Sequence, residues 1–230
     1  LRTTAGFAAA LFQYHKENNT LDRTEEITNK KTEKFLLLGG DLSGIQDYIF
    51  NLETTTFNAK ILRARSFELQ LISDSVCSTV LDGLYLPIFC KLMDAGGRFL
   101  TVLPNLSSCK SFIEEIRTSI ETAFLDNYFG ELTLNISNGL QVSSEQLRQD
   151  KAREVFRNLA IDTAEAKSRK LQQALKLKGH IIGLHYDNIT GNENICPICH
   201  KRPVERTLTH IQEEHQLCSS CYNLVKLGQQ

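Results

Sequence analysis

Two Cys-x-x-Cys pairs near the carboxyl end carry the clearest chemical signal in the sequence. Cys196 and Cys199 form the first pair, Cys218 and Cys221 form the second, and the stretch between them runs from His200 to Leu217. Four thiolates at this spacing can surround one zinc ion tetrahedrally and leave no position for water, as in structural zinc sites. A redox role or another metal is the alternative. The pattern therefore predicts a structural zinc module.

The remaining cysteines and the nearby histidines have simpler interpretations. Seven cysteines in a cytosolic chain would stay reduced, so structural disulfides are not expected. Three cysteines stand singly among apolar or small residues, and we expect them in the core: Cys77, Cys90 and Cys109. Three histidines close to the zinc pairs could each replace a thiol, but four thiols already complete the coordination, so we expect these histidines at the surface: His200, His210 and His215.

A second candidate site lies in the segment KFLLLGGDLSGIQDYIF at residues 34–50. The apolar run 35–38 predicts a strand buried on both faces. Glycines 39, 40 and 44 are expected where the chain turns into a helix, and Asp41 or Ser43 could cap that helix. A phosphate would meet free backbone amides there. A turn selected only for its geometry is the alternative interpretation.

The motifs of this chain resemble, in order, parts of the large subunit of type III-A CRISPR effector complexes, the family that makes cyclic oligoadenylates. GGDLSGIQDYIFN and LRARSFELQL at 62–71 resemble its first palm-type domain, and AGGRFLTVLPN at 95–105 resembles the glycine-rich hairpin of that domain. CPIC and CSSC resemble its zinc module, and TTAGFAAALFQY resembles the last helix of its histidine–aspartate nuclease domain. The resemblance covers nearly the whole chain.

The turn of the glycine-rich hairpin indicates whether this chain could hold catalytic metal ions. Catalytic palms carry acidic residues at this turn, where they hold two divalent ions for phosphoryl transfer. The corresponding turn here is Gly96-Gly97-Arg98-Phe99, and a guanidinium cannot ligate Mg²⁺. The resemblance implies that the catalytic acidic pair belongs to a second palm that this chain does not contain. We therefore expect no catalytic residues in this chain, which should be inactive alone.

What the resemblance implies instead is nucleotide contact. The first palm of the family faces the second across a pocket for two ATP molecules, with Mg²⁺ supplied only together with that second palm. The candidate contacts lie around the glycine-rich turn: Gly40, Asp41, Ser43, Gly44 and Gln46. Weaker candidates begin the next helix, where packing or simple exposure is the alternative: Arg63, Arg65 and Ser66.

The apolar periodicity predicts an α+β fold. After the strand at 35–38 and its short helix come a helix at 61–81, strands at 88–93 and 99–103, a helix at 111–124 and a strand at 132–137. The order β-α-α-β-β-α-β is that of a ferredoxin-like palm domain. Two helices then follow before residue 179, one opened by a capping box of Ser143 and Gln146 and one by Asp162, with a short strand at 180–186.

These elements suggest four parts. Residues 1–20 are the end of a preceding helical domain, residues 21–34 a polar linker with few large apolar residues, residues 35–140 the palm-like domain, and residues 141–230 a mainly helical domain with the zinc module. The chain starts at Leu1 instead of methionine, which suggests a fragment.

The net charge and the lengths of the apolar runs limit the partners and the location that we expect for the chain. The net charge of -1 argues against a protein that coats nucleic acid, although the basic excess between residues 151 and 178 could face RNA or could simply be solvated. No apolar run approaches the roughly 18 residues of a membrane span, so we expect a soluble, cytoplasmic protein and no membrane partner.

Three functional hypotheses remain. The first is a non-catalytic palm with a zinc module, which scaffolds the ribonucleoprotein with its other subunits, guide RNA and target RNA, and forms half of an ATP pocket. The second is a stand-alone nucleotidyl cyclase, against which the turn at 96–99 counts. The third is a zinc-ribbon RNA-binding adaptor without a nucleotide site.

Overall fold

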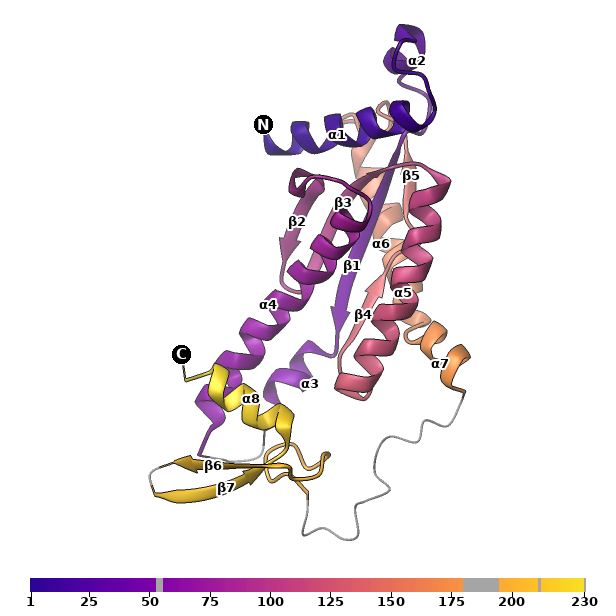
Figure 1. The fold of residues 1–230 in the computed structure, drawn as a ribbon. Coiled ribbons are helices and arrows are strands. Elements are labelled where there is room, and N and C mark those ends of the chain that lie inside the picture. The colour runs from indigo at the N-terminus through magenta and orange to yellow at the C-terminus, as the bar shows by residue number, and fades with distance from the viewer. Residues whose placement is uncertain (53–55, 180–194, 211, 230) are drawn as a thin grey trace. The chain divides into compact units, whose positions relative to one another are not determined.

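The computed structural model of the chain describes residues 1–52, 56–179, 195–210 and 212–229 (Figure 1). Its contacts define two compact units. Unit 1 comprises Leu1–Ser43 and Gln70–Leu177, and unit 2 comprises Gly44–Leu69 and Lys178–Gln230. This division differs from the boundary expected near residue 140, because helix α6 (Ala152–Ser168), which follows residue 140, packs on the sheet of unit 1.

Unit 1 is built on an antiparallel sheet. Its strands are β1 (Phe35–Ser43), β2 (Lys91–Ala95), β3 (Arg98–Pro104), β4 (Thr133–Ile136) and β5 (Leu140–Val142). The strand order is β2-β3-β1-β4, and β5 also pairs with β1. The run Phe35 to Leu38 is buried on both faces of the sheet, as its sequence predicts. The central strand β1 therefore carries the core of the unit.

Helices cover both faces of this sheet. The helices of unit 1 are α1 (Arg2–Glu17), α2 (Thr24–Thr28), the part of α4 (Asn58–Gly83) from Gln70 onward, α5 (Ser107–Tyr128), α6 (Ala152–Ser168) and α7 (Gln172–Lys178) as far as Leu177. Figure 1 shows α5 and the second part of α4 on one face, and α6 on the other. Helix α1 contacts β3 and the short 3₁₀ helix η1 (Ile88–Cys90). No described helix is both long and apolar enough to traverse a bilayer.

The expectation that Gly39 and Gly40 form a turn is wrong. Strand β1 continues to Ser43, and Gly40 pairs with Phe99 of β3. A Cβ on Gly40 would lie 2.2 Å from the Phe99 ring, so this glycine makes room for an aromatic side chain. Only Gly44 has a turn conformation, with φ of 90° at the start of α3 (Ile45–Phe50). A glycine is therefore needed at position 40 because of the Phe99 ring, which is distant in sequence, and not because of a turn.

Other elements also begin at residues that differ from those expected. The strand expected from residue 88 begins at Lys91, because Ile88–Cys90 forms η1. Ser143 and Gln146 do form the reciprocal bonds of a capping box, at 2.8 Å and 3.3 Å, but they open a turn and not a helix. Asp162 lies inside α6 instead of starting a new helix.

The segment expected to be a plain linker contains the short helix α2. It is held in place by Lys34, whose side chain is buried and donates hydrogen bonds to the carbonyl oxygens of Glu26 and Ile27 at the end of that helix. A buried ammonium must find acceptors, and the free carbonyls at a helix end supply them. The strand expected at 180–186 lies outside the described residues.

Unit 2 has a small core of its own. Its elements are α3, the part of α4 up to Leu69, β6 (Arg206–His210), β7 (Glu213–Leu217) and α8 (Ser219–Leu227). Strands β6 and β7 form an antiparallel hairpin that the sequence analysis did not anticipate. The four paired cysteines are packed with apolar side chains from the start of α4 and the residue before it, from the first cysteine loop, and from β6, β7 and α8: Phe57, Ile61, Ala64, Ile198, Leu208, Leu217, Leu224 and Val225.

Candidate metal centre and nucleotide-site residues

The structure brings the four paired cysteines together into one cluster. The Sγ atoms of Cys196, Cys199, Cys218 and Cys221 all lie within 4.8 Å of one another. The Cys199 and Cys218 sulfurs are 3.8 Å apart. Four sulfurs at the usual Zn–S distance in a tetrahedron would be separated by about 3.8 Å. The donor set and its spacing therefore fit a tetrahedral zinc ion.

Local backbone geometry positions these thiols. The Cys196 amide donates to the Arg202 carbonyl at 2.8 Å, and the His200 amide donates to the Cys196 carbonyl at 2.9 Å, which folds the first pair into a tight loop. In the second pair, Cys218 caps α8, and its sulfur accepts from the Cys221 amide at 3.4 Å. Amides that donate to sulfur, and the positive end of a helix, both favour thiolates.

The cluster also polarises its own thiols. Hydrogen bonds from Cys199, Cys218 and Cys221 lower the pKa of the Cys196 thiol. The pKa values of the Cys218 and Cys221 thiols are raised, because each donates a hydrogen bond to the Cys196 sulfur. Four thiolates this close together would repel one another, so a divalent cation that neutralises their charge would stabilise the cluster.

The other cysteines and the histidines play different roles. Cys77, Cys90 and Cys109 are buried as predicted, and burial raises the pKa of Cys77 to about 12. His200 is exposed. His210 and His215 are not simple surface residues, since their rings lie 5.4 Å and 4.9 Å from the ring of Phe57.

Three candidate nucleotide contacts lie in β1 of unit 1. Gly40 faces the Phe99 ring, and Ser43 accepts a hydrogen bond from the Asn135 side chain at 2.9 Å. The Asp41 side chain is only 9% exposed, and its Oδ2 atom forms ion pairs with Arg98 Nε at 3.0 Å and Lys167 Nζ at 2.7 Å. Neither Asp41 nor Ser43 caps α3, because Gly44 occupies the cap position. Asp41 thus anchors two cations that the sequence analysis did not assign to the site.

The other five candidates belong to unit 2. Gly44 begins α3, while Gln46 and Arg63 are exposed. Arg65 is buried: its guanidinium lies 4.8 Å from the centre of the Tyr48 ring and donates to the Tyr48 carbonyl. Ser66 donates to the Leu62 carbonyl at 2.8 Å within its own helix. Packing therefore accounts for Arg65 and Ser66, and the nucleotide contacts of all eight residues stay a prediction.

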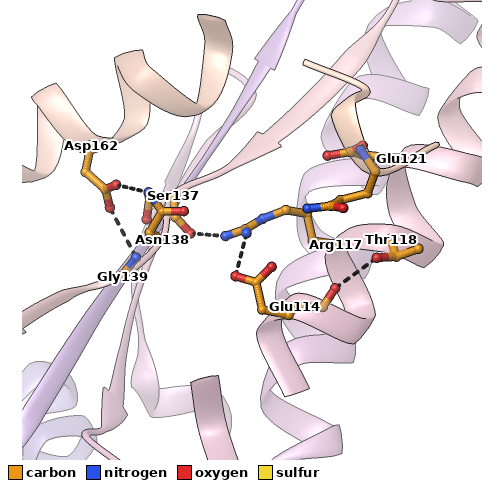
Figure 2. A network of polar contacts seen from close by, with 9 residues as sticks. Glu114, Arg117, Thr118, Glu121, Ser137, Asn138, Gly139 and Asp162 are labelled. Atoms are coloured by element: carbon orange, nitrogen blue, oxygen red, sulfur yellow. Dashed lines mark hydrogen bonds and ion pairs between the residues drawn. The ribbon is translucent and has the colours of Figure 1, made fainter. Parts of the chain in front are cut away.

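A polar network fixes helix α6, which carries Lys167 (Figure 2). Asp162 of α6 accepts hydrogen bonds from the Asn138 side chain at 2.8 Å and from the Gly139 amide at 3.1 Å, in the loop between β4 and β5. From the other side, Arg117 of α5 donates to the Ser137 carbonyl at 2.9 Å. The loop is thus held by both helix layers, which sets the position of α6 on the sheet.

The chain is a mixed α/β protein: it combines an antiparallel sheet covered by helices with a four-cysteine cluster suited to a metal ion. Residues 34–181 match the family described as Csm1 subunit domain B. The chain therefore belongs to that family. It is 30% identical, over 231 aligned residues, to the CRISPR system single-strand-specific deoxyribonuclease Cas10/Csm1 of subtype III-A from Thermococcus onnurineus. That alignment covers 99% of this chain and 29% of the relative, so the chain spans less than a third of the relative's length.

Solved structures give the same result. A Csm1-Csm4 cassette in complex with pppApA superposes with a TM-score of 0.67 at 28% identity, covering 75% of this chain and 24% of the other. A Csm1-Csm4 cassette in complex with one ATP superposes with a TM-score of 0.58 at 30% identity, covering 69% of this chain and 21% of the other. Both similarities support the family assignment.

Proposed function

We propose that the sheet of unit 1 is a non-catalytic palm domain, which forms half of an ATP pocket for a catalytic palm elsewhere in the parent protein. The observation that carries this proposal is the turn between β2 and β3. Its Gly96, Gly97 and Arg98 supply no carboxylate, and Arg98 is paired with Asp41. The strand order β4-β1-β3-β2, read from the other edge of the sheet, supports the proposal, because a ferredoxin-like palm would have this order.

Two further observations support the proposal, the first for nucleotide binding and the second for the lack of catalysis. The similar Csm1-Csm4 cassettes were crystallised with one ATP and with pppApA, which are nucleotide ligands of the kind proposed here. In addition, the described residues contain one group suited to a metal ion, the four cysteines, and this group lies in unit 2. Two-metal phosphoryl transfer requires carboxylates at this turn, and its residues Gly96, Gly97 and Arg98 supply none. The chain alone would therefore hold nucleotide without converting it.

The zinc module has a structural role in this proposal. Zinc held by Cys196, Cys199, Cys218 and Cys221 stabilises unit 2, because the cysteines are part of its core. In the parent protein, both units would form a scaffold for the other subunits of the complex, its guide RNA and its target RNA. ATP would act with Mg²⁺ only when the second palm is present.

Photo-crosslinking tests the pocket directly. The chain is irradiated with 8-azido-ATP, digested, and mapped by mass spectrometry, with excess unlabelled ATP as competitor. We expect competed labelling within residues 40–46 or 63–66. Labelling that ATP does not compete, or that maps only to other peptides, would contradict the pocket. Competition by RNA but not by ATP would support the adaptor hypothesis instead.

A further inference from the structure

Two cations outside the predicted nucleotide contacts share one buried anchor in unit 1. Arg98 follows the hairpin turn, and Lys167 lies in the last turn of α6. Both pair with the same oxygen of Asp41, which is 9% exposed, while the side chains of Arg98 and Lys167 are 64% and 36% exposed. The anchor is thus buried and the cations reach solvent. This arrangement leaves one net positive charge at the surface.

The geometry of Arg98 leaves its best donors unused. Its ion pair uses Nε, and the described residues provide no other partner for its two terminal NH₂ groups. A guanidinium held through Nε has lost side-chain freedom before any ligand arrives. Its terminal groups retain the geometry that binds phosphate oxygens.

The surrounding sheet surface is polar as well. Arg98, Asp41 and Asn135 lie opposite one another on three adjacent strands, so their side chains are on the same face. Ser43 pairs with Thr133 one step along this face, and the buried Thr133 hydroxyl has no hydrogen-bond partner among the described residues. Buried hydroxyls usually have partners, so an unpaired one on the same sheet face as Arg98 is consistent with a ligand group.

We propose that Arg98 and Lys167 bind the phosphates of a nucleoside triphosphate, with Asp41 as the positioning residue that holds both cations. The inference rests on the proposed ATP pocket and adds to it the two residues that would recognise the triphosphate. Asp41 itself does not touch the phosphates, because like charges repel and its carboxylate is already engaged. Its role is to hold Arg98 of β3 and Lys167 of α6 at the sheet face that also carries Ser43 and Thr133.

Calorimetric titration of the full 230-residue chain with tripolyphosphate, ATP and adenosine tests this assignment. We expect ATP and tripolyphosphate to bind, more weakly at higher salt, and Arg98→Gln or Lys167→Gln to weaken each of them by about tenfold. Arg98→Lys should restore only part of the loss, since a lysine lacks the planar fork. Lys16→Gln is the control, because it removes one positive charge from an exposed position on α1.

Circular dichroism melting of each variant separates lost binding from lost folding. The inference is overturned if neither phosphate compound binds, or if both bind the two glutamine variants as tightly as the unsubstituted chain. ATP binding that is unchanged in those variants would leave the proposed pocket intact and refute only the role of the two cations. Equal Arg98-dependent binding of ATP and tripolyphosphate would support the cations but count against a nucleotide pocket. A short RNA that binds through Arg98 more tightly than ATP would refute the triphosphate assignment.

Discussion

Replacement of Cys199 by serine should remove the metal and unfold unit 2 alone. Serine is a poor zinc ligand, and Cys199 is the least buried of the four cysteines, so the substitution leaves little cavity. The core of unit 2 contains seven apolar side chains larger than alanine, which together supply about 10–20 kcal/mol at ~1.5–3 kcal/mol each. A structural zinc site contributes about 10–16 kcal/mol. Its loss is therefore as large as the ~5–15 kcal/mol net stability of an ordinary domain.

Hydrogen exchange read by mass spectrometry, with metal analysis of the same sample, measures this outcome. We expect Cys199→Ser to contain no zinc and to lose amide protection across residues 195–210 and 212–229, while β1, β3 and β4 stay protected. Cys109→Ala is the matched control, because Cys109 is buried in α5 of unit 1. The reasoning is refuted if unit 2 stays protected without metal, or if the sheet of unit 1 loses protection as well.

Three further outcomes follow from unit 1. Gly40→Ala should destabilise the chain by ~1–3 kcal/mol in urea denaturation, because its Cβ would overlap the Phe99 ring, and Phe99→Leu in the same chain should recover part of the loss. Glu121→Gln should expose the amides of α7 to exchange and cost ~1–3 kcal/mol locally, because the Glu121 carboxylate accepts from the Gln173 amide at 2.6 Å and from the Ala174 amide at 3.1 Å. Burial lowers the pKa of His15 from its ordinary value of 6.5, so the unfolded chain takes up this proton first and stability should fall as the pH drops below 6.5.

Each of these expectations has its own check. Equal stability of the Gly40→Ala chain with either residue at position 99 would show that the close approach to the ring is unimportant. For α7, Glu115→Gln is the control, since Glu115 is an exposed residue of the same helix α5. For the pH effect, His15→Gln should flatten the difference in unfolding free energy between pH 7.5 and 5.5, and an unchanged difference would contradict the role of His15.

The sequence was most informative where the determining contacts are local. The spacing of Cys196, Cys199, Cys218 and Cys221 sufficed to predict one cluster, because two tight loops bring each pair together. The apolar run at 35–38 predicted a buried strand, because a strand buried on both faces needs successive apolar residues. The order of strands and helices from β1 to β4 likewise agrees with the periodicity, whereas α2 and β5 were not predicted.

The sequence was least informative where strand register decides the outcome. From the sequence alone, Gly40 is interpreted as a turn residue. The structure shows that it lies opposite Phe99 on β3. From the sequence alone, Asp41 is interpreted as a helix cap or a ligand contact. In the structure it pairs with Arg98 of the hairpin and with Lys167 of α6. The one available signal was an acidic residue after a buried strand, which requires a charged partner. Neither partner could be chosen without the register.

Manganese binding followed by electron paramagnetic resonance, with analysis of ATP products from the same preparation, tests the central claim most directly. The account predicts that the zinc-loaded chain binds no Mn²⁺ tightly when ATP is absent, and that it forms no linked adenylates when ATP and Mg²⁺ are added. Two tightly bound Mn²⁺ ions together with an oligoadenylate product would contradict the claim that this sheet positions nucleotide without catalysing its conversion.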